Sequence, residues 1–404
     1  GQFVLLMLRI LVLLIVIAGI RRFFNIRQDI NDAVDSVHID QRMPALLGAR
    51  AYDPLLRKYH DPKTSPEDRA HILTALGFLA ETGGLKERDR QEEMFKMLCE
   101  MLQVENIKDK SVWAVKARGE AAVTLAKIRH EDMATVHVLE KLLNSNPSTL
   151  VQEKIAEALG LLRKRNEAGD VIGNADTMAE SAARVVLAKL KELVKNGTKS
   201  PNVLKLFVES IGLLLEKMPK ERKSQEAIDL LLDESTGLLT KGYLRVQNRA
   251  ATSLGRMADP RAAIPLLKRL SEPDLDPHRN PELRRAVGLA LGRLDFSIDA
   301  TNRDAAIDAL LQVVTSQNEE ENEDVKLDFA RALAWLKVEG ATRDQTLKAL
   351  KSMLVEAVQD NRTGRIDKLL KVLREFDKKE RREAKVLIKE IQERQAKDVE
   401  SLAD

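Results

Sequence analysis

The sequence predicts an all-α chain in which one helical hairpin is repeated along most of its length. Ten-residue windows with apolar residues three and four positions apart recur at intervals of 34 to 52 residues. A helical spacing that returns about every 40 residues is typical of stacked helical hairpins. Ala, Leu, Glu, Lys and Arg dominate the 404 residues, which favours helix over strand. Aromatic residues make up only 3%, fewer than the core of a sandwich or barrel usually contains.

The first element is an apolar segment at residues 3–20, FVLLMLRILVLLIVIAGI, which runs from Phe3 to Ile20 with Arg9 as its single charge. About 20 apolar residues span a bilayer core, so residues 1–22 are predicted to be a transmembrane anchor. Arg9 lies in the first half of the segment, from where its side chain can reach the nearer membrane surface.

The residues that follow this segment bear on its orientation and on whether it is cleaved. Arg21 and Arg22 follow directly, and positive residues favour the cytoplasmic side, so a cytoplasmic repeat array is preferred over a periplasmic one. A cleaved signal peptide is the alternative. It is disfavoured because Ala18 and Gly19 are followed by Ile20 and two arginines, which make a poor cleavage site. The expected localisation is therefore a single-pass membrane protein.

Residues 23–64 are predicted to connect the anchor to the array and to cap the first hairpin. Short helical pieces are interrupted by proline and glycine at Pro44, Gly48, Pro54 and Pro62. The array itself is predicted to cover residues 65–376, and its first helix begins at Thr64-Ser65-Pro66-Glu67, with proline in the first turn.

Seven windows define the repeated helix, and each ends in Gly or Ala. They are DRAHILTALG (68–77), ARGEAAVTLA (117–126), VQEKIAEALG (151–160), VLKLFVESIG (203–212), VQNRAATSLG (246–255), LRRAVGLALG (283–292) and VKLDFARALA (325–334). The fifth, eighth and ninth positions are small or apolar and share one helix face, and the final residue packs in the same crowded line. We expect these small residues to let the next hairpin approach closely, in about seven to eight stacked hairpins.

The second window position is also regular, because it holds a basic or amide residue in every window except the one with Leu204. The residues are Arg69, Arg118, Gln152, Gln247, Arg284 and Lys326. Such a row could line a surface that binds a partner. The preferred alternative is an inter-repeat ladder, in which each side chain bonds an Asp or a carbonyl of the adjacent turn.

The windows, and above all ADPRAAIPLL at 258–267, resemble HEAT repeats. The pattern is clear in the windows that start at 151, 246, 283 and 325 and degenerate in the other three, over roughly residues 65–355. The resemblance implies a right-handed, armadillo-like α-solenoid that binds proteins. It does not identify the partner, since one fold hosts many functions.

Three segments depart from the repeat. Gly169, Gly173 and Asn174 predict a long loop within 163–186. The acidic run at 316–324 predicts a solvated loop, with attraction of a basic partner as the alternative. Residues 377–404 predict a charged helix that caps the last hairpin, at 364–376, and binding of a partner is again the alternative.

No motif in the sequence predicts chemistry. The six histidines are scattered, Cys99 is the single cysteine, and there is no zinc, phosphate-loop, nucleophile-elbow or dinucleotide signature. We therefore expect no catalytic residue, cofactor, metal or small-molecule substrate. DNA glycosylases and phycobilin lyases resemble HEAT arrays, but the net charge of +3 gives no drive toward nucleic acid, and the predicted anchor disfavours both.

The sequence thus favours a non-catalytic scaffold, anchored in a membrane and bound to the proteins of a multi-subunit membrane complex. The alternative is a membrane-tethered adaptor or lyase-like module that acts transiently on a soluble client protein.

Overall fold

The structure is a computed structural model, and all its regular elements within the described residues are helices. Seventeen α-helices and a short 3-10 turn occupy these ranges, which contain no strand and confirm the all-α prediction. The described residues are 51–81, 88–103, 111–128, 133–145, 147–162, 175–198, 200–216, 218–219, 223–236, 238–240, 242–272, 275, 280–297, 299–316 and 322–403.

The chain divides into two compact units, Gly1–Val185 and Val186–Asp404, and the division lies within α9 (Ala175–Lys195). The helices of the first unit are α3 (Tyr52–His60), α4 (Pro66–Glu81), α5 (Arg88–Leu102), α6 (Val112–Ile128), α7 (Met133–Asn144) and α8 (Thr149–Leu161). As the sequence predicts, α4 starts with Pro66, and the Ser65 hydroxyl accepts a hydrogen bond from the Asp68 amide at 3.1 Å.

The second unit continues the same alternation of helices. Its helices are α10 (Pro201–Leu215), α11 (Gln225–Leu232), α12 (Leu244–Met257), α13 (Ala263–Leu270), α14 (Pro281–Arg293), α15 (Ala300–Thr315), α16 (Glu323–Trp335), α17 (Gly340–Gln359), α18 (Thr363–Phe376) and α19 (Lys378–Ala403). The 3-10 turn Pro260–Ala262 precedes α13. The Asp259 carboxylate caps this turn by accepting a hydrogen bond from the Arg261 amide at 2.9 Å.

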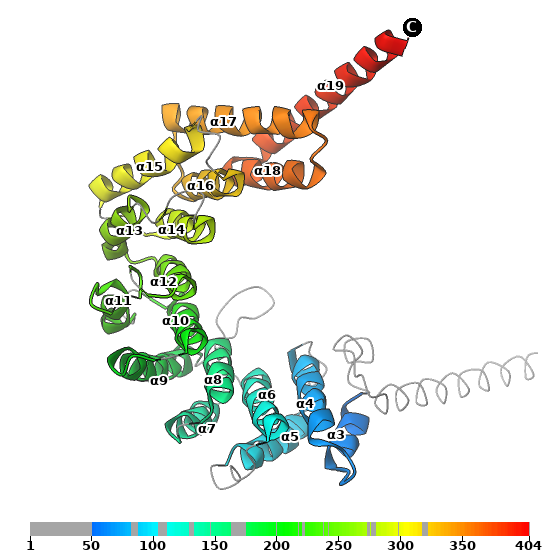
Figure 1. Cartoon of the computed structure of the whole chain (residues 1–404), viewed down its shortest axis with the longest axis vertical. Coiled ribbons are helices and arrows are strands. Elements are labelled where there is room, and N and C mark those ends of the chain that lie inside the picture. Colours follow the sequence, from blue (N-terminus) through cyan, green and yellow to red (C-terminus); the bar gives the residue numbers. More distant parts are fainter. Residues whose placement is uncertain are drawn as a thin grey trace, which may run out of the picture. The chain divides into compact units, whose positions relative to one another are not determined.

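Each unit stacks its helices in two layers. Even-numbered helices contact one another in sequence, α4 to α6 to α8 in the first unit and α10 to α12 to α14 to α16 to α18 in the second. We call these the even-helix rows (Figure 1). Odd-numbered helices contact the even helix that follows them, as in α5 with α6 and α13 with α14. Stacking of hairpins in this way is the arrangement of a helical repeat array.

All seven sequence windows lie in even-numbered helices, from α4 to α16. Their small residues set how closely consecutive even helices approach. A Cβ atom added at Gly255 would lie only 2.7 Å from the Cα atom of Ala290 on the next even helix. The same relation, between the tenth position of one window and the eighth of the next, holds for Gly77 with Thr124, Gly212 with Ser253, and Gly292 with Ala332.

Two hydroxyl groups bond neighbouring even helices together at this line. The Thr124 hydroxyl donates to the Leu73 carbonyl at 3.0 Å, and the Ser253 hydroxyl donates to the Val208 carbonyl at 2.7 Å. Both hydroxyls occupy the eighth window position, and both carbonyls belong to the sixth position of the preceding window. Since a buried hydroxyl needs a partner, these bonds also fix the register between the helices.

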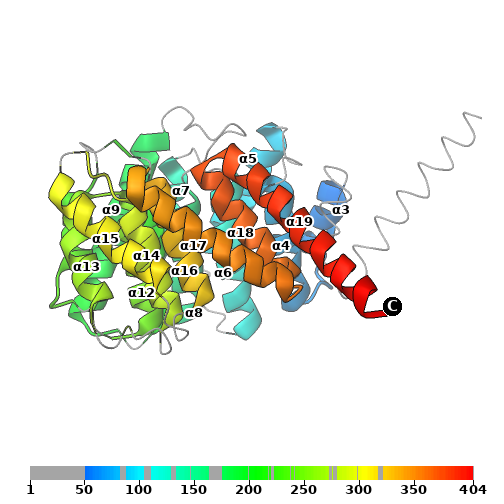
Figure 2. The same ribbon diagram turned by 90° about the horizontal axis from the view of Figure 1, so that it is seen from above.

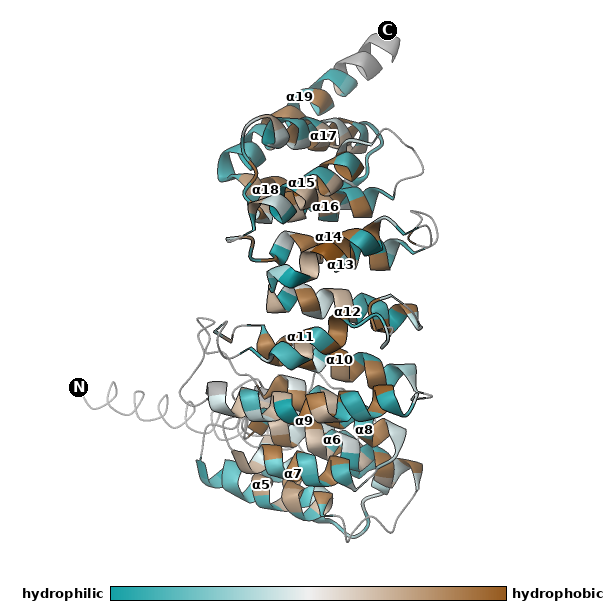
Figure 3. Ribbon diagram, turned by 90° about the vertical axis from the view of Figure 1, so that its left-hand side faces the viewer, coloured by the Kyte–Doolittle hydropathy of each residue, from teal (hydrophilic) through white to brown (hydrophobic). Residues whose placement is uncertain are grey.

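The sequence predicts a location in a membrane, with an orientation inferred from the arginines after the anchor. The structure corrects this prediction. Among the described residues, no helix combines the length and the apolar character needed to cross a bilayer. Figure 3 shows that the apolar stretches of these helices are short and broken by hydrophilic residues. The prediction rested on a single apolar segment from Phe3 to Ile20, with Arg9, Arg21 and Arg22, and that segment lies outside the described residues.

Other predictions also fall wholly or partly outside the described residues. These are residues 23–50 of the predicted N-terminal connection, 163–174 of the predicted long loop and 317–321 of the acidic run. The predicted domain limits at 22/23, 64/65 and 376/377 stay predictions.

Within the second unit, α19 packs against α17 and α18, and its Ala384 is fully buried.

Candidate interaction surface

The residues at the second window position bond to the chain segment that leads into their own helix. Gln152 Nε2 donates to the Pro147 carbonyl at 2.8 Å, and Gln247 Nε2 donates to the Gly242 carbonyl at 3.2 Å. The remaining bonds of this kind run from Arg69 Nη2 to Asp61 O (3.2 Å), from Arg284 Nη1 to Leu275 O (3.2 Å) and from Lys326 Nζ to Ser316 O (2.7 Å).

These five bonds therefore close the turns inside their own hairpins. The acceptors are carbonyl groups, as expected for the predicted ladder between repeats. However, each acceptor belongs to the same hairpin as its donor and not to the neighbouring hairpin. Arg118 is buried on α6, and Leu204, the exception in the sequence, is buried on α10. The structure does not bring the row together into one site, and binding of a partner by these residues stays a prediction.

Gln247 takes part in a second, fully buried contact. Arg269 on α13 has no exposed surface, and its Nη2 donates to Gln247 Oε1 at 2.8 Å. Its Nη1 pairs with Glu272 Oε2 at 2.5 Å. The guanidinium group thus joins an odd helix to an even helix of the second unit. A buried charge is tolerated only when it is paired in this way.

A ladder of polar contacts between consecutive even helices does exist, and the window residues that take part in it occupy the third, fourth and seventh positions. In the first unit Lys154 Nζ lies 3.2 Å from Glu120 Oε1, and in the second unit Arg249 Nη1 lies 3.3 Å from Glu209 Oε1. Burial lowers the pKa of Lys154, but Glu120 and Glu157 more than offset this, so the pKa lies above its ordinary value.

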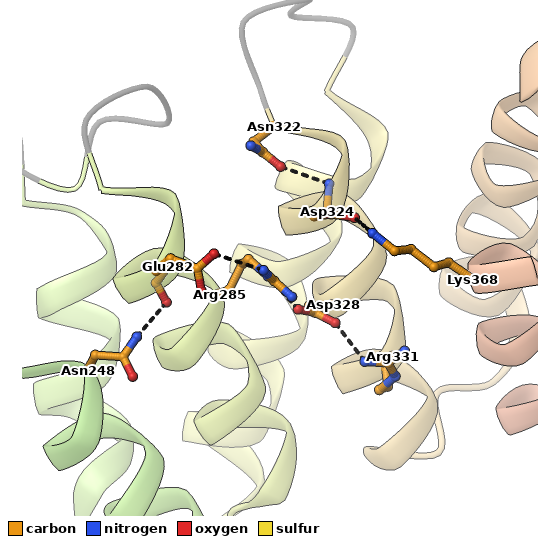
Figure 4. A network of polar contacts seen from close by, with 8 residues as sticks. All are labelled: Asn248, Glu282, Arg285, Asn322, Asp324, Asp328, Arg331 and Lys368. Atoms are coloured by element: carbon orange, nitrogen blue, oxygen red, sulfur yellow. Dashed lines mark hydrogen bonds and ion pairs between the residues drawn. The ribbon is translucent and has the colours of Figure 1, made fainter. Parts of the chain in front are cut away.

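The ladder is longest from α12 to α18, where Figure 4 shows its polar contacts. Asn248 Nδ2 donates to the Glu282 carbonyl at 3.0 Å, which links α12 to α14. Asp328 on α16 then accepts from Arg285 Nε and from Arg331 Nη1, both at 2.7 Å. Further links from α16 to α18 are Arg331 with Glu375 (3.0 Å), Lys368 with Asp324 (2.8 Å) and Arg365 with Glu323 (2.7 Å).

Asp328 is the buried centre of this ladder, since its side chain is only 6% exposed. Replacing it by asparagine is expected to lower the free energy of unfolding by about 1–3 kcal/mol, because two charge-assisted bonds weaken at a buried position. Urea unfolding followed by circular dichroism measures the change. The matched control is Asp324→Asn, on the same helix but with a side chain that is 42% exposed. It should change stability by less than about 1 kcal/mol. Equal losses in the two variants would contradict the assigned role of Asp328.

A cavity of about 420 Å³ lies beside the α12 end of this ladder. Its lining comes from α10, α12 and the start of α14, and consists of Lys205, Leu244, Arg245, Asn248, Arg249 and residues 280–283. One of the lining side chains, Leu244, is apolar and 46% exposed, and the preceding residue Tyr243 is 50% exposed. An exposed apolar side chain at a cavity is a feature of surfaces that bind other molecules.

The cavity is mainly basic. Its lining contains Lys205, Arg245 and Arg249 and a single carboxylate residue, Glu282. Sequence reasoning missed the cavity because Tyr243 and Leu244 precede the window and because its walls come from three different hairpins. Within the described residues there is no group of three His, Cys, Asp or Glu side chains that could hold a metal ion.

No protein-family model matches the chain, and no curated protein matches it. The solved structures that are similar to this chain include two at low identity. One concerns a conserved phosphorylation switch that controls the interaction between cadherin and beta-catenin, with 15% identity over 86% of this chain and 68% of that chain, and a TM-score of 0.39. The other is human deoxyhypusine hydroxylase in complex with glycerol, with 18% identity over 82% of this chain and 98% of that chain, and a TM-score of 0.27. At these scores neither likeness carries an argument about this chain.

Proposed function

We propose that the chain is a non-catalytic scaffold that binds protein partners, built as a right-handed HEAT-like array and serving as a structural subunit of a multi-protein assembly. The observation that carries the proposal is the cavity of about 420 Å³ between α10, α12 and α14, with Leu244 half-exposed beside it. No membrane role is part of the proposal.

The chemistry of the cavity suits a protein segment that presents an apolar side chain flanked by acidic residues. The apolar side chain would contact Leu244, where water is released on binding. Acidic residues would face Lys205 and Arg245, which raises the association rate and selects against basic partners.

The rigidity of the even-helix row also supports binding at this place. The helices on either side of the cavity are held by contacts already described, Ser253 to the Val208 carbonyl and Gly255 against Ala290. A surface that is ordered before binding loses little conformational entropy when the partner arrives.

The test is native affinity purification of the tagged full chain as wild type and as Leu244→Asp. A stoichiometric protein partner should be retained by the wild type and depleted at least tenfold by Leu244→Asp, because a carboxylate next to the acidic partner removes both the apolar contact and the charge complementarity. Leu244 is the first residue of α12, where an aspartate also suits the helix, so folding should be preserved.

The matched control is Ile264→Asp, which places the same charge at an exposed apolar residue of the odd helix α13. This variant should keep the partner. Loss of the partner in both variants, or purification of the wild type without any stoichiometric partner, would contradict a scaffold that binds through this cavity. A client that is captured only after crosslinking would instead favour the adaptor that acts transiently.

A further inference from the structure

A second cavity of about 420 Å³ lies between α18 and α19, and five basic side chains line it. They are Arg374, Lys378, Arg381, Arg382 and Lys385. Figure 2 shows α17, α18 and α19 together, with α19 crossing beside the other two helices, and all three pairs are in contact. No carboxylate contributes to the lining of this cavity.

Three acidic residues of the same two helices, Glu375, Glu380 and Glu383, are paired with residues outside this cavity. Glu380, which is buried, lies 3.0 Å from Arg343 and 3.2 Å from Lys351, both on α17. Glu383 also reaches Lys351, and Glu375 pairs with Arg331 on α16. Within the part of the chain that the structure describes, none of the five basic side chains forms an ion pair.

Positive charge is concentrated at the start of α19. Lys378, Arg381 and Arg382 occupy the first turns of α19, where the helix dipole is already positive. The Nε atom of Arg381 is buried and has no hydrogen-bond acceptor among the described residues. Buried polar groups are normally satisfied, so this donor of Arg381 lacks the acceptor that such groups usually have.

We propose that this cavity binds a compact polyphosphate, a small molecule with two or more phosphate groups. Three guanidinium groups can each bind phosphate oxygens through two hydrogen bonds, and two ammonium groups add charge. The five basic residues line one cavity, whose size suits a small molecule of several hundred daltons. The proposal does not depend on the cavity beside α12, because it involves different helices.

The probe is inositol hexakisphosphate, titrated calorimetrically into the full chain, with inorganic phosphate as a probe that has a single phosphate group. The chain should bind inositol hexakisphosphate with one-to-one stoichiometry and at least tenfold more tightly than inorganic phosphate. Binding should raise the midpoint of thermal unfolding and weaken as salt is added.

The decisive variant is Arg382→Gln with Lys385→Gln, which removes two exposed charges from the cavity and keeps good helix formers. The affinity should fall at least tenfold. The matched control is Lys371→Gln with Arg394→Gln, two exposed residues of α18 and α19 outside the cavity, with the same change in net charge. The control should bind within twofold of the wild type. A third variant, Arg381→Lys, keeps the charge but removes the planar donor group, and should weaken binding at least fivefold.

Absence of binding by the wild type would overturn the proposal. Equal losses in the two double variants would also overturn it, because they would show attraction by net charge alone. Tighter binding of a glutamate-rich peptide than of inositol hexakisphosphate would identify an acidic protein segment as the ligand and reject the polyphosphate.

Discussion

Replacing Gly255 by valine is expected to lower the free energy of unfolding by about 3 kcal/mol, which is at the upper end of the cost of overpacking. A Cβ atom at this position would lie 2.7 Å from Cα and 3.0 Å from Cβ of Ala290. The nearest obstacle is backbone, so no side-chain rotation relieves it. α12 and α14 must therefore move apart, which also reduces contacts of Leu254 and Leu291, both fully buried.

Urea unfolding of the full chain, followed by circular dichroism, measures this loss. The control is Gly364→Val near the start of α18, where an added Cβ meets no atom within 4 Å. Valine has a higher helix propensity than glycine, so this variant should be neutral or slightly more stable than the wild type. A Gly255→Val protein as stable as the control would show that the even helices are not packed as closely as described.

Replacing Arg269 by alanine is the second substitution with a large expected effect, a loss of about 3–5 kcal/mol. The side chain has no exposed surface and bonds Gln247 at 2.8 Å and Glu272 at 2.5 Å. Its removal leaves the buried Oε1 of Gln247 without this donor and opens a cavity between α12 and α13. The same urea unfolding experiment measures the change.

The double variant Gln247→Leu with Arg269→Leu separates the buried charge from the packing. Because both polar partners are replaced by apolar groups, it should be more stable than Arg269→Ala by about 1–2 kcal/mol or more. A double variant that is less stable than Arg269→Ala would mean that the bond from Gln247 to the Gly242 carbonyl, at 3.2 Å, matters more than the contact with Arg269.

The helices were predictable because their signals are local. The window at 246–255 has the helical spacing of apolar residues. The Asp259-Pro260 pair that follows it interrupts the helix, and this signal involves only a few neighbouring residues. The structure places α12, the 3-10 turn and α13 accordingly. The small eighth and tenth positions of the windows also predicted close approach of neighbouring hairpins, which the contact of Gly255 with Ala290 shows.

The polar contacts were not predictable, because they depend on the register between helices about 40 residues apart in sequence. Arg285 and Asp328 occupy the third and fourth positions of different windows and meet at 2.7 Å. Regularity drew attention to the second position instead, but Gln152 and Gln247 use it to close their own turns. A repeated residue type thus reflected a need that recurs within most hairpins, whereas the ion pairs between hairpins use a different pair of positions each time.

The contact of Gly255 with Ala290 depends on two residues, one in each of two consecutive hairpins. We call the interface between two consecutive hairpins a joint. A hairpin copied whole carries a tenth-position glycine for its successor and a small eighth-position residue for its predecessor, so it fits at both of its joints. Arrays of this kind can therefore lengthen by duplication without any compensating substitution. Exchange of a hairpin with one from an unrelated array requires matching small residues at both joints.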